Sequence, residues 1–97
     1  MDGSRSVELA SGFRALADPV RVTIVRSLAG GTRCACELQR AAGVSAPLLS
    51  HHLKVLRQAG LVSGQRRGRW VDYTLERDAL RRLLGAIDVL EAVGAAT

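Results

Sequence analysis

The 97-residue chain is poor in the features that define several classes of protein. Aromatic residues make up 3% of it, and proline and cysteine each occur twice. No apolar run is long enough to span a bilayer, and the N-terminal stretch lacks the basic-then-apolar pattern of a secretory signal. We therefore expect a single domain over residues 1–97, cytoplasmic and without a membrane partner. In a reducing compartment two cysteines are typical of free thiols for metal or redox chemistry rather than of a structural cross-link.

Acidic residues are also missing from one long stretch. Residues 38–71 contain no Asp or Glu but six Lys and Arg, whereas the whole chain has a net charge of only +5. A solvated basic face is one explanation, but an acid-free block of this length indicates a nucleic-acid-binding surface. We find no nucleophile–base pair, phosphate-binding loop or carboxylate pair. We therefore expect that the protein is not an enzyme and has no substrate.

What the chain does have is helical periodicity with clear end signals. Leu9, Phe13 and Leu16 predict a first amphipathic helix. A second helix is capped by Asp18, begins with Pro19 and ends at the pair Gly30-Gly31. Its buried face is predicted to consist of Val20, Ile24 and Leu28.

Two short helices follow, joined by "GVS". The first starts at Cys34, where Glu37 completes the spacing of a capping box, and ends at Gly43. The next is capped by Ser45 and ends at Gly60. The residues predicted to face inward from it are Leu49, Leu53 and Leu56. This pair of helices predicts a helix-turn-helix.

After residue 60 the period changes to alternation, which predicts a β-hairpin with Val71, Tyr73 and Leu75 on one face and a turn near Arg67-Gly68. The last segment has a continuous apolar stripe, which requires a partner helix and consists of Leu80, Leu83, Leu84, Ile87 and Leu90. The predicted fold is mainly α with a small β-hairpin (α+β), a winged helix-turn-helix. We expect a homodimer formed through the first and last helices.

Four segments in this order, "ALADPVRVTIVRSL", "CACEL", "SAPLLSHHLKVLRQAGLV" and "RRGRWVDYTL", carry a family resemblance. Over about residues 9–87 the chain resembles the ArsR/SmtB family of metal-sensing winged-helix repressors. The resemblance implies a dimer that binds double-stranded operator DNA and releases it when an inducer binds.

A recognition helix presents its N-terminal half to base edges in the major groove. The hydroxyls of Ser45 and Ser50 can bond to bases, and His51 can donate to a purine. Lys54 and Arg57 are expected to lie toward phosphate. His52 is expected to turn toward the protein. Ser45 serves as a helix cap whether or not it contacts DNA. The arginines of the hairpin suit a wing that reaches phosphates or a minor groove, a solvated tip being the alternative. The predicted DNA-binding residues are Ser45, Ala46, Pro47, Leu48, Ser50, His51, Lys54, Arg57, Arg66, Arg67 and Arg69.

The two cysteines, Cys34 and Cys36, are the candidate metal ligands. An N-cap residue is not helical, so the two sulfurs can converge, and the positive end of the helix dipole favours the thiolate, a soft ligand. Arsenic sensors of the resembling family carry C-x-C-x-x-C here, and Gln39 stands at the third position. The resemblance therefore implies As(III) as inducer with two protein thiolates, a third ligand coming from water or a small thiol. Two-coordinate Hg(II) is an alternative, and no ion is needed for folding.

Other uses of this chain remain open. Zinc and nickel sensors of the resembling family use His and carboxylates on the last helix, where this sequence has Asp88 and Glu91 but no His. Cadmium and lead sensors add cysteines from an N-terminal arm, which has none here. A thiol-based redox regulator of the same fold is the alternative function, through a reversible disulfide or sulfenic acid. The cysteines could also serve only as a small apolar residue and a helix cap.

Overall fold

A computed structural model describes residues 3–96 of the chain and the side chains of residues 5–86. Five helices and three short strands follow one another within these residues. In chain order they are α1 (Gly3–Leu16), α2 (Pro19–Ala29), β1 (Arg33–Cys34), α3 (Ala35–Ala42), α4 (Ala46–Gln58), β2 (Val62–Arg67), β3 (Trp70–Leu75) and α5 (Arg77–Ala96). The winged helix-turn-helix predicted from the sequence is confirmed.

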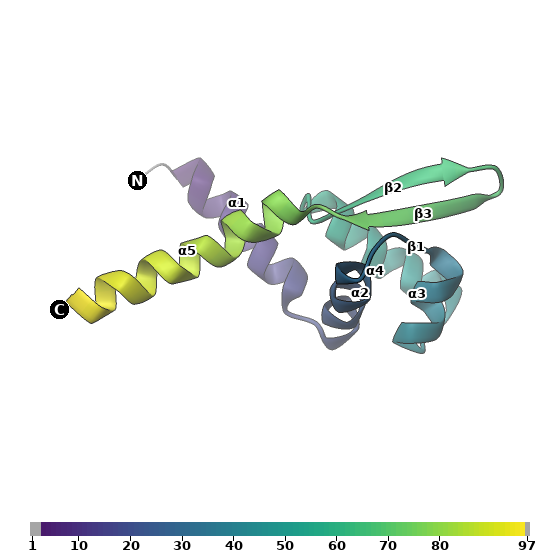
Figure 1. Cartoon of the computed structure of the whole chain (residues 1–97), viewed down its shortest axis with the longest axis horizontal. Helices are drawn as coiled ribbons and strands as arrows, with labels where there is room; N and C mark the ends of the chain where they lie inside the picture. Colours follow the sequence, from purple (N-terminus) through teal and green to yellow (C-terminus); the bar gives the residue numbers. More distant parts are fainter. Residues whose placement is uncertain (1–2, 97) are drawn as a thin grey trace.

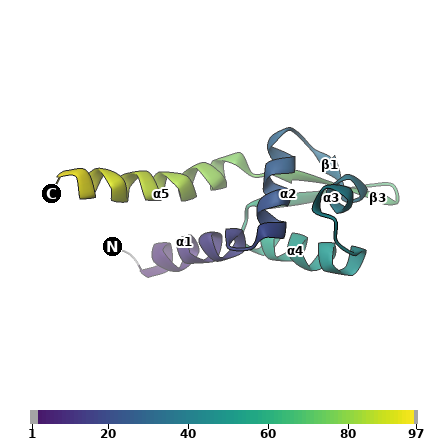
Figure 2. The same cartoon turned by 90° about the horizontal axis from the view of Figure 1, so that it is seen from below.

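The molecule is elongated, with principal extents of 52 × 23 × 21 Å. Helices α1 and α5 extend from one end, and the β2–β3 hairpin projects from the other (Figure 1). Between them, α2, α3 and α4 form the helical body, as the turned view also shows (Figure 2). No helix within the described residues is long and apolar enough to cross a membrane.

The helix ends follow the capping residues that the sequence predicts. Asp18 caps α2 and accepts hydrogen bonds from the backbone N–H groups of Val20 and Arg21. Helix α3 ends at Gly43, which has a left-handed φ of 66° that favours glycine. Ser45 caps α4 by accepting a bond from the Leu48 N–H. These local bonds fix where the two helices of the helix-turn-helix start and stop.

The core lies between α2, α3, α4 and the base of the hairpin. Leu49, Leu53 and Leu56 of α4 are buried as predicted. The largest fully buried side chains come from three helices and the start of the wing: Ile24, Leu28, Leu38, Leu56 and Leu61. Replacing one such leucine by alanine costs about 2–5 kcal/mol, so this cluster holds α4 against α2, α3 and the base of the hairpin.

Two small residues of helix α1 are buried, and one of its three predicted apolar residues is exposed. Phe13 is 37% exposed, while Gly12 and Ala15 are buried. The reason is the close approach of α5, because a Cβ added at Gly12 would lie only 3.0 Å from Cδ1 of Leu83. Phe13 is exposed in the single chain, on a helix that is expected to take part in the dimer contact, whereas Leu9 and Leu16 are half-buried against the core.

Helix α5 has the predicted apolar stripe only in part within the described side chains. Leu83 is buried and Leu80 half-buried, but Leu84 is 48% exposed. The side chains of Ile87 and Leu90 lie outside the described residues. Val7 and Phe13 of α1 are exposed as well, so both helices at this end of the chain carry exposed apolar side chains.

The three strands form one antiparallel sheet in the order β1-β3-β2. Leu75 is buried and Val71 and Tyr73 are half-buried, as the alternation predicts, and Gly68 takes a φ of 64° in the hairpin turn. The strand β1 was not predicted, because two residues are too few to show alternation.

Candidate nucleic-acid interface and thiol site

The predicted DNA-contacting residues lie on two exposed surfaces of one molecule. Those of α4 follow its outer side from the N-cap onward, and those of the wing surround the hairpin turn. All of the predicted positions are exposed: Ser45, Ala46, Pro47, Leu48, Ser50, His51, Lys54, Arg57, Arg66, Arg67 and Arg69. Their contact with DNA stays a prediction, but every one of these side chains is accessible to a partner.

His52 faces the protein interior, as the helix phase predicts, and is only 6% exposed. Its Nδ1 lies 3.0 Å from Nη1 of Arg21 on α2. Because a guanidinium has no acceptor, Arg21 donates this bond and the imidazole hydrogen is on Nε2. Asp18 Oδ1 lies 4.0 Å from the same ring nitrogen. The recognition helix is thus bonded to the start of α2.

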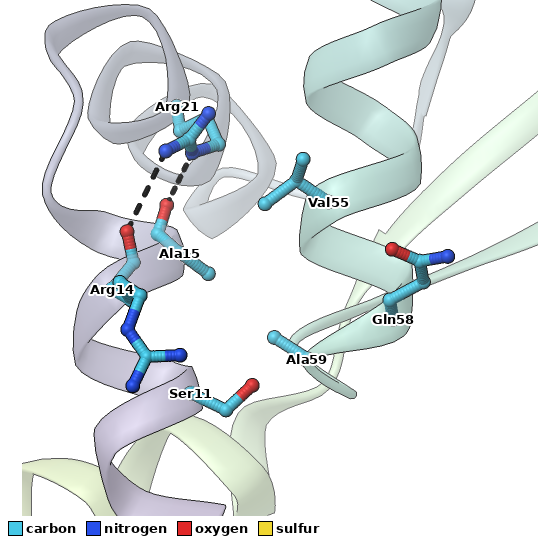
Figure 3. Close-up of a pocket in the computed structure, with 7 residues that line it drawn as sticks. All are labelled: Ser11, Arg14, Ala15, Arg21, Val55, Gln58 and Ala59. Carbon is cyan, nitrogen blue, oxygen red and sulfur yellow. Dashed lines mark hydrogen bonds between the residues drawn. The ribbon is translucent and has the colours of Figure 1, made fainter.

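Arg21 also bonds to the end of α1. Its Nε donates to the carbonyl of Ala15 at 2.6 Å, and its Nη2 donates to the carbonyl of Arg14 at 3.5 Å. These three residues border a pocket that is also lined by Ser11, Val55, Gln58 and Ala59 (Figure 3). One side chain therefore connects α1, α2 and α4. Arg21 could not be singled out from its sequence neighbours, because nothing local to it shows where its long side chain ends.

The wing contains one ion pair that the sequence analysis missed. Nε of Arg67 donates to Oδ2 of Asp72 at 2.8 Å, and Nη2 to Oδ1 at 3.3 Å. This hydrogen-bonded pair lowers the pKa of Asp72 below its usual value and raises that of Arg67. Arg66 and Arg69 have no ion pair within the described residues, so they are the freer cations of the wing.

A signal for this pair does exist in the sequence. Arg67 faces Trp70 across the β2–β3 ladder, and Asp72, two residues beyond Trp70 on β3, is its diagonal neighbour on the same face of the sheet. Diagonal side chains of this length come within reach of each other. Asp72 is also the first acidic residue after the basic block.

The two cysteines converge at the start of α3. Cys34 is the N-cap with φ −75° and ψ 161°, outside helical geometry, and its Cα lies 5.4 Å from that of Cys36. Their sulfurs are joined as a disulfide, so the expectation of two free thiols is not met in this structure. The physical reason is the extended N-cap residue, which lets side chains two positions apart turn toward each other.

The predicted capping box is present around these sulfurs. Cys34 Sγ accepts the Glu37 N–H at 3.4 Å, and Glu37 Oε1 accepts the Cys34 N–H at 3.3 Å. Cys34 is half-buried and Cys36 is exposed. The Cys34 sulfur therefore takes part in holding the first turn of α3.

Among the side chains that the structure describes, no third ligand stands beside the pair. Within the described residues there is no group of three His, Cys, Asp or Glu side chains that could hold a metal ion. The side chains of Asp88 and Glu91 lie outside the described residues. Cys34 and Cys36 can supply two sulfur ligands when reduced, and a three-coordinate ion needs one more from elsewhere.

The thiol site is also joined to the wing. Cys34 belongs to β1, which pairs with β3 so that Cys34 lies opposite Asp72 and Arg33 opposite Tyr73. Thr32 and Thr74 add a hydroxyl–hydroxyl bond of 2.9 Å beside this ladder.

The helix-turn-helix of α3 and α4, the exposed outer side of α4 and the basic hairpin together define a class of protein. They are the parts of a winged helix-turn-helix protein of the kind that binds DNA.

Comparison with known proteins agrees with that class. A sequence profile described as "Bacterial regulatory protein, arsR family" matches residues 18–63. The chain is 47% identical over 81 residues to the HTH-type transcriptional repressor SmtB of Mycobacterium tuberculosis, which covers 84% of this chain and 56% of that protein. It is 42% identical over 64 residues to the arsenical resistance operon repressor of Escherichia coli, a match that covers 65% of this chain and 55% of that protein. The chain thus spans little more than half the length of these two relatives.

The solved structure of the transcriptional repressor BigR from Xylella fastidiosa is 31% identical, with a TM-score of 0.71 and 89% of each chain covered. The chain therefore belongs to the ArsR family of bacterial regulatory proteins. This fold and family are those of transcriptional regulators and not of enzymes, as the sequence predicts.

Proposed function

We propose that this chain is a cytoplasmic transcriptional repressor that binds operator DNA as a homodimer and releases it when a thiophilic ion binds Cys34 and Cys36. As(III) is the first candidate, and Hg(II) is an alternative. The observation that carries the proposal is the convergence of the two sulfurs at the N-cap of α3, the first helix of the helix-turn-helix. The name of the Escherichia coli relative, an arsenical resistance operon repressor, supports the choice of ion.

DNA binding is supported by the exposed face of α4 and by the wing. The N-terminal half of α4 presents Ser50 and His51 for base contacts, and Lys54 and Arg57 follow for phosphates. The freer wing arginines, Arg66 and Arg69, extend this basic surface at the far end of the hairpin. One such domain contacts few phosphates, so a second copy is needed for tight binding.

Dimerisation through α1 and α5 is supported by apolar side chains that the single chain leaves exposed. Val7 is 70%, Phe13 37% and Leu84 48% exposed, all on these two helices. Large exposed apolar side chains on neighbouring helices are typical of an interface. A solved relative in Mycobacterium bovis, 24% identical, is described as a homodimeric winged helix-turn-helix domain.

The ion acts on DNA binding through the cap. A Cys34 sulfur that binds an ion gives up the Glu37 N–H bond, which loosens the first turn of α3. Helix α3 packs on α4, and β1 pairs with β3, so the change reaches both the recognition helix and the wing. The two recognition helices of a dimer must stand about 34 Å apart, so a small tilt costs contacts in both half-sites.

A second candidate function is redox sensing, and the disulfide between Cys34 and Cys36 favours it. Two thiols at this distance lose two electrons and two protons to an oxidant such as hydrogen peroxide, which is reduced to two waters. The disulfide then fixes the N-cap in one conformation. Oxidation and ion binding exclude each other, because each uses both sulfurs.

The test is electrophoretic binding of the reduced protein to its own promoter, with and without arsenite, Hg(II) and peroxide. Cys34→Ser and Cys36→Ser are each expected to bind DNA like the wild type, because serine keeps the cap, and to stay bound when arsenite is added. Wild-type release corresponds to a coupling of about 1–3 kcal/mol, or a 5- to 150-fold loss of DNA affinity.

Ala35→Ser is the matched control, since it places the same side chain between the two cysteines and leaves both sulfurs. It is expected to respond to arsenite like the wild type. If either cysteine variant is released at the wild-type arsenite concentration, the two-thiolate site is wrong. Release by peroxide alone assigns the site to redox sensing.

A further inference from the structure

A groove between α2 and α3 lies beside the cysteine pair. It has a volume of about 290 Å³ and is lined by Ser27, Arg33, Glu37, Leu38, Arg40 and Ala41. A second hollow of about 390 Å³ shares Ser27 and Ala41 with it and adds Thr23 and Arg26. Because the two hollows share these lining residues, we refer to them together as the α2–α3 groove.

The α2–α3 groove lies beside the thiols. Arg33 is the residue before Cys34, and the Glu37 N–H donates to the Cys34 sulfur. Arg40 stands four residues after Cys36, so the two side chains are neighbours on one helix face, with Cβ atoms about 5–6 Å apart. Both are exposed. Neither cysteine lines the groove, but Glu37, which does, bonds to the Cys34 sulfur, and Arg40 is the helical neighbour of Cys36.

The charge of the groove favours an anion. Arg26, Arg33 and Arg40 supply three guanidinium groups, and no ion pair within the described residues neutralises any of them. The one carboxylate at the groove, that of Glu37, already accepts the backbone N–H of Cys34. Guanidinium groups bind carboxylates through paired, charge-assisted hydrogen bonds. The hydroxyls of Thr23 and Ser27 add polar groups along the wall.

The cysteine pair, in turn, has no third protein ligand among the described side chains. Trivalent arsenic forms three bonds, Cys34 and Cys36 supply two sulfurs, and the side chain at the next family position is the amide of Gln39. Soft ions select sulfur over amide oxygen. A third ligand must come from outside the described side chains, either water or the sulfur of another molecule, and a soft ion favours the sulfur.

We propose that the α2–α3 groove binds the carboxylate part of a low-molecular-weight anionic thiol, whose sulfur completes the coordination of As(III) at Cys34 and Cys36. The inference rests on the proposed function and adds a co-ligand to it. In the reaction, arsenous acid loses its three hydroxyl groups as water while three thiols each lose a proton. Three As–S bonds replace three As–O bonds, and no oxidant or reductant is consumed.

The experiment uses the full chain, free of DNA and reduced with a phosphine so that no other thiol is present. Arsenite affinity is measured with equal concentrations of 3-mercaptopropionate, which is anionic, or 2-mercaptoethanol, which is neutral and of similar size. We expect about tenfold tighter arsenite binding with the anionic thiol, the effect of one charged hydrogen-bonded contact. Native mass spectrometry is expected to show one arsenic and one thiol per chain.

Arg40→Gln is expected to reduce that tenfold ratio to about one while leaving binding with the neutral thiol unchanged. Arg81→Gln, which removes an exposed arginine of α5 that does not line the groove, is the matched control and should keep the ratio. Far-ultraviolet circular dichroism checks that both variants are folded.

The outcomes separate the two proposals. If arsenite binds the wild type through both cysteines but the two thiols give equal affinity, or the adduct contains no thiol, the groove proposal is overturned and the proposed function stands. If arsenite fails to bind the reduced wild type under either condition, the ion-sensing function itself is wrong. A ratio that survives Arg40→Gln also overturns the groove.

Discussion

Cys34 lies directly opposite Asp72 across the β1–β3 ladder, and the carboxylate of Asp72 holds Arg67 of the wing by two hydrogen bonds. The candidate inducer site and a cation of the candidate DNA surface are therefore one strand apart. Backbone pairing joins Cys34 to Asp72, and the ion pair joins Asp72 to Arg67. A change at the N-cap of α3 has a direct path to the wing as well as to α4.

Asp72→Asn is expected to free Arg67 for phosphate contact. DNA binding should tighten, and the plot of log affinity against log salt should steepen by about one unit per subunit. The fold loss of DNA affinity on adding arsenite should fall, because β3 no longer anchors Arg67. Both quantities come from fluorescence anisotropy titrations at several salt concentrations.

Asp78→Asn is the control for that variant, since it breaks another exposed carboxylate–arginine pair, with Arg81 on α5. It should leave the salt slope and the arsenite response unchanged. A wild-type slope in Asp72→Asn would mean that Arg67 does not reach DNA.

Leu84→Glu is expected to give monomers that lose operator binding, because it places a charge in the proposed α1–α5 interface. Sedimentation velocity measures the assembly state. Leu48→Glu carries the same change at a side chain of α4 that is similarly exposed, 43% against 48%. That variant should remain dimeric while losing DNA affinity, and a dimeric Leu84→Glu would place the interface elsewhere.

The adjacent histidines of α4 are expected to behave in opposite ways. His52→Ala removes a buried partner of Arg21 and should lower the free energy of unfolding by about 1–3 kcal/mol. His51→Ala changes an exposed side chain, so its stability should stay within about 0.5 kcal/mol of the wild type while its DNA affinity falls. Urea unfolding and DNA titration of both variants give the comparison. Equal stability losses would contradict the assigned orientations.

Asp18 is expected to make stability depend on acid pH. Partial burial raises its pKa, but hydrogen bonds from the Arg21 and Val20 backbone outweigh this and hold the pKa below the usual 3.8. A carboxyl with a lower pKa in the folded state stabilises the fold above the unfolded-state pKa. That contribution is lost as pH falls from about 4 through the folded-state value.

Asp18→Asn keeps a good cap but does not titrate, so its stability should fall less steeply below pH 4 than that of the wild type. Urea unfolding at several pH values between about 2.5 and 6 measures the two slopes. Parallel curves for the two proteins would show that Asp18 does not contribute to this pH dependence.

The sequence by itself determined the features that depend on neighbours a few residues apart. Asp18-Pro19, Cys34 with Glu37, and Ser45 each complete a local set of hydrogen bonds, so the starts of α2, α3 and α4 could be predicted from the chain. The phase of α4 likewise separated buried His52 from exposed His51. Extended geometry at an N-cap allowed the convergence of Cys34 and Cys36 to be predicted.

Only the tertiary structure decided the contacts between residues far apart in the chain. The pairing of β1 with β3, the bond from Arg21 to His52, the close approach of Gly12 to Leu83 and the α2–α3 groove all depend on how the elements pack. Long side chains such as those of Arg21 and Arg67 have many rotamers, and only the packed surroundings select one. Local hydrogen bonds therefore determine where the helices start, which the sequence can show. The pairing of β1 with β3 and the α2–α3 groove form only when segments far apart in the chain pack together.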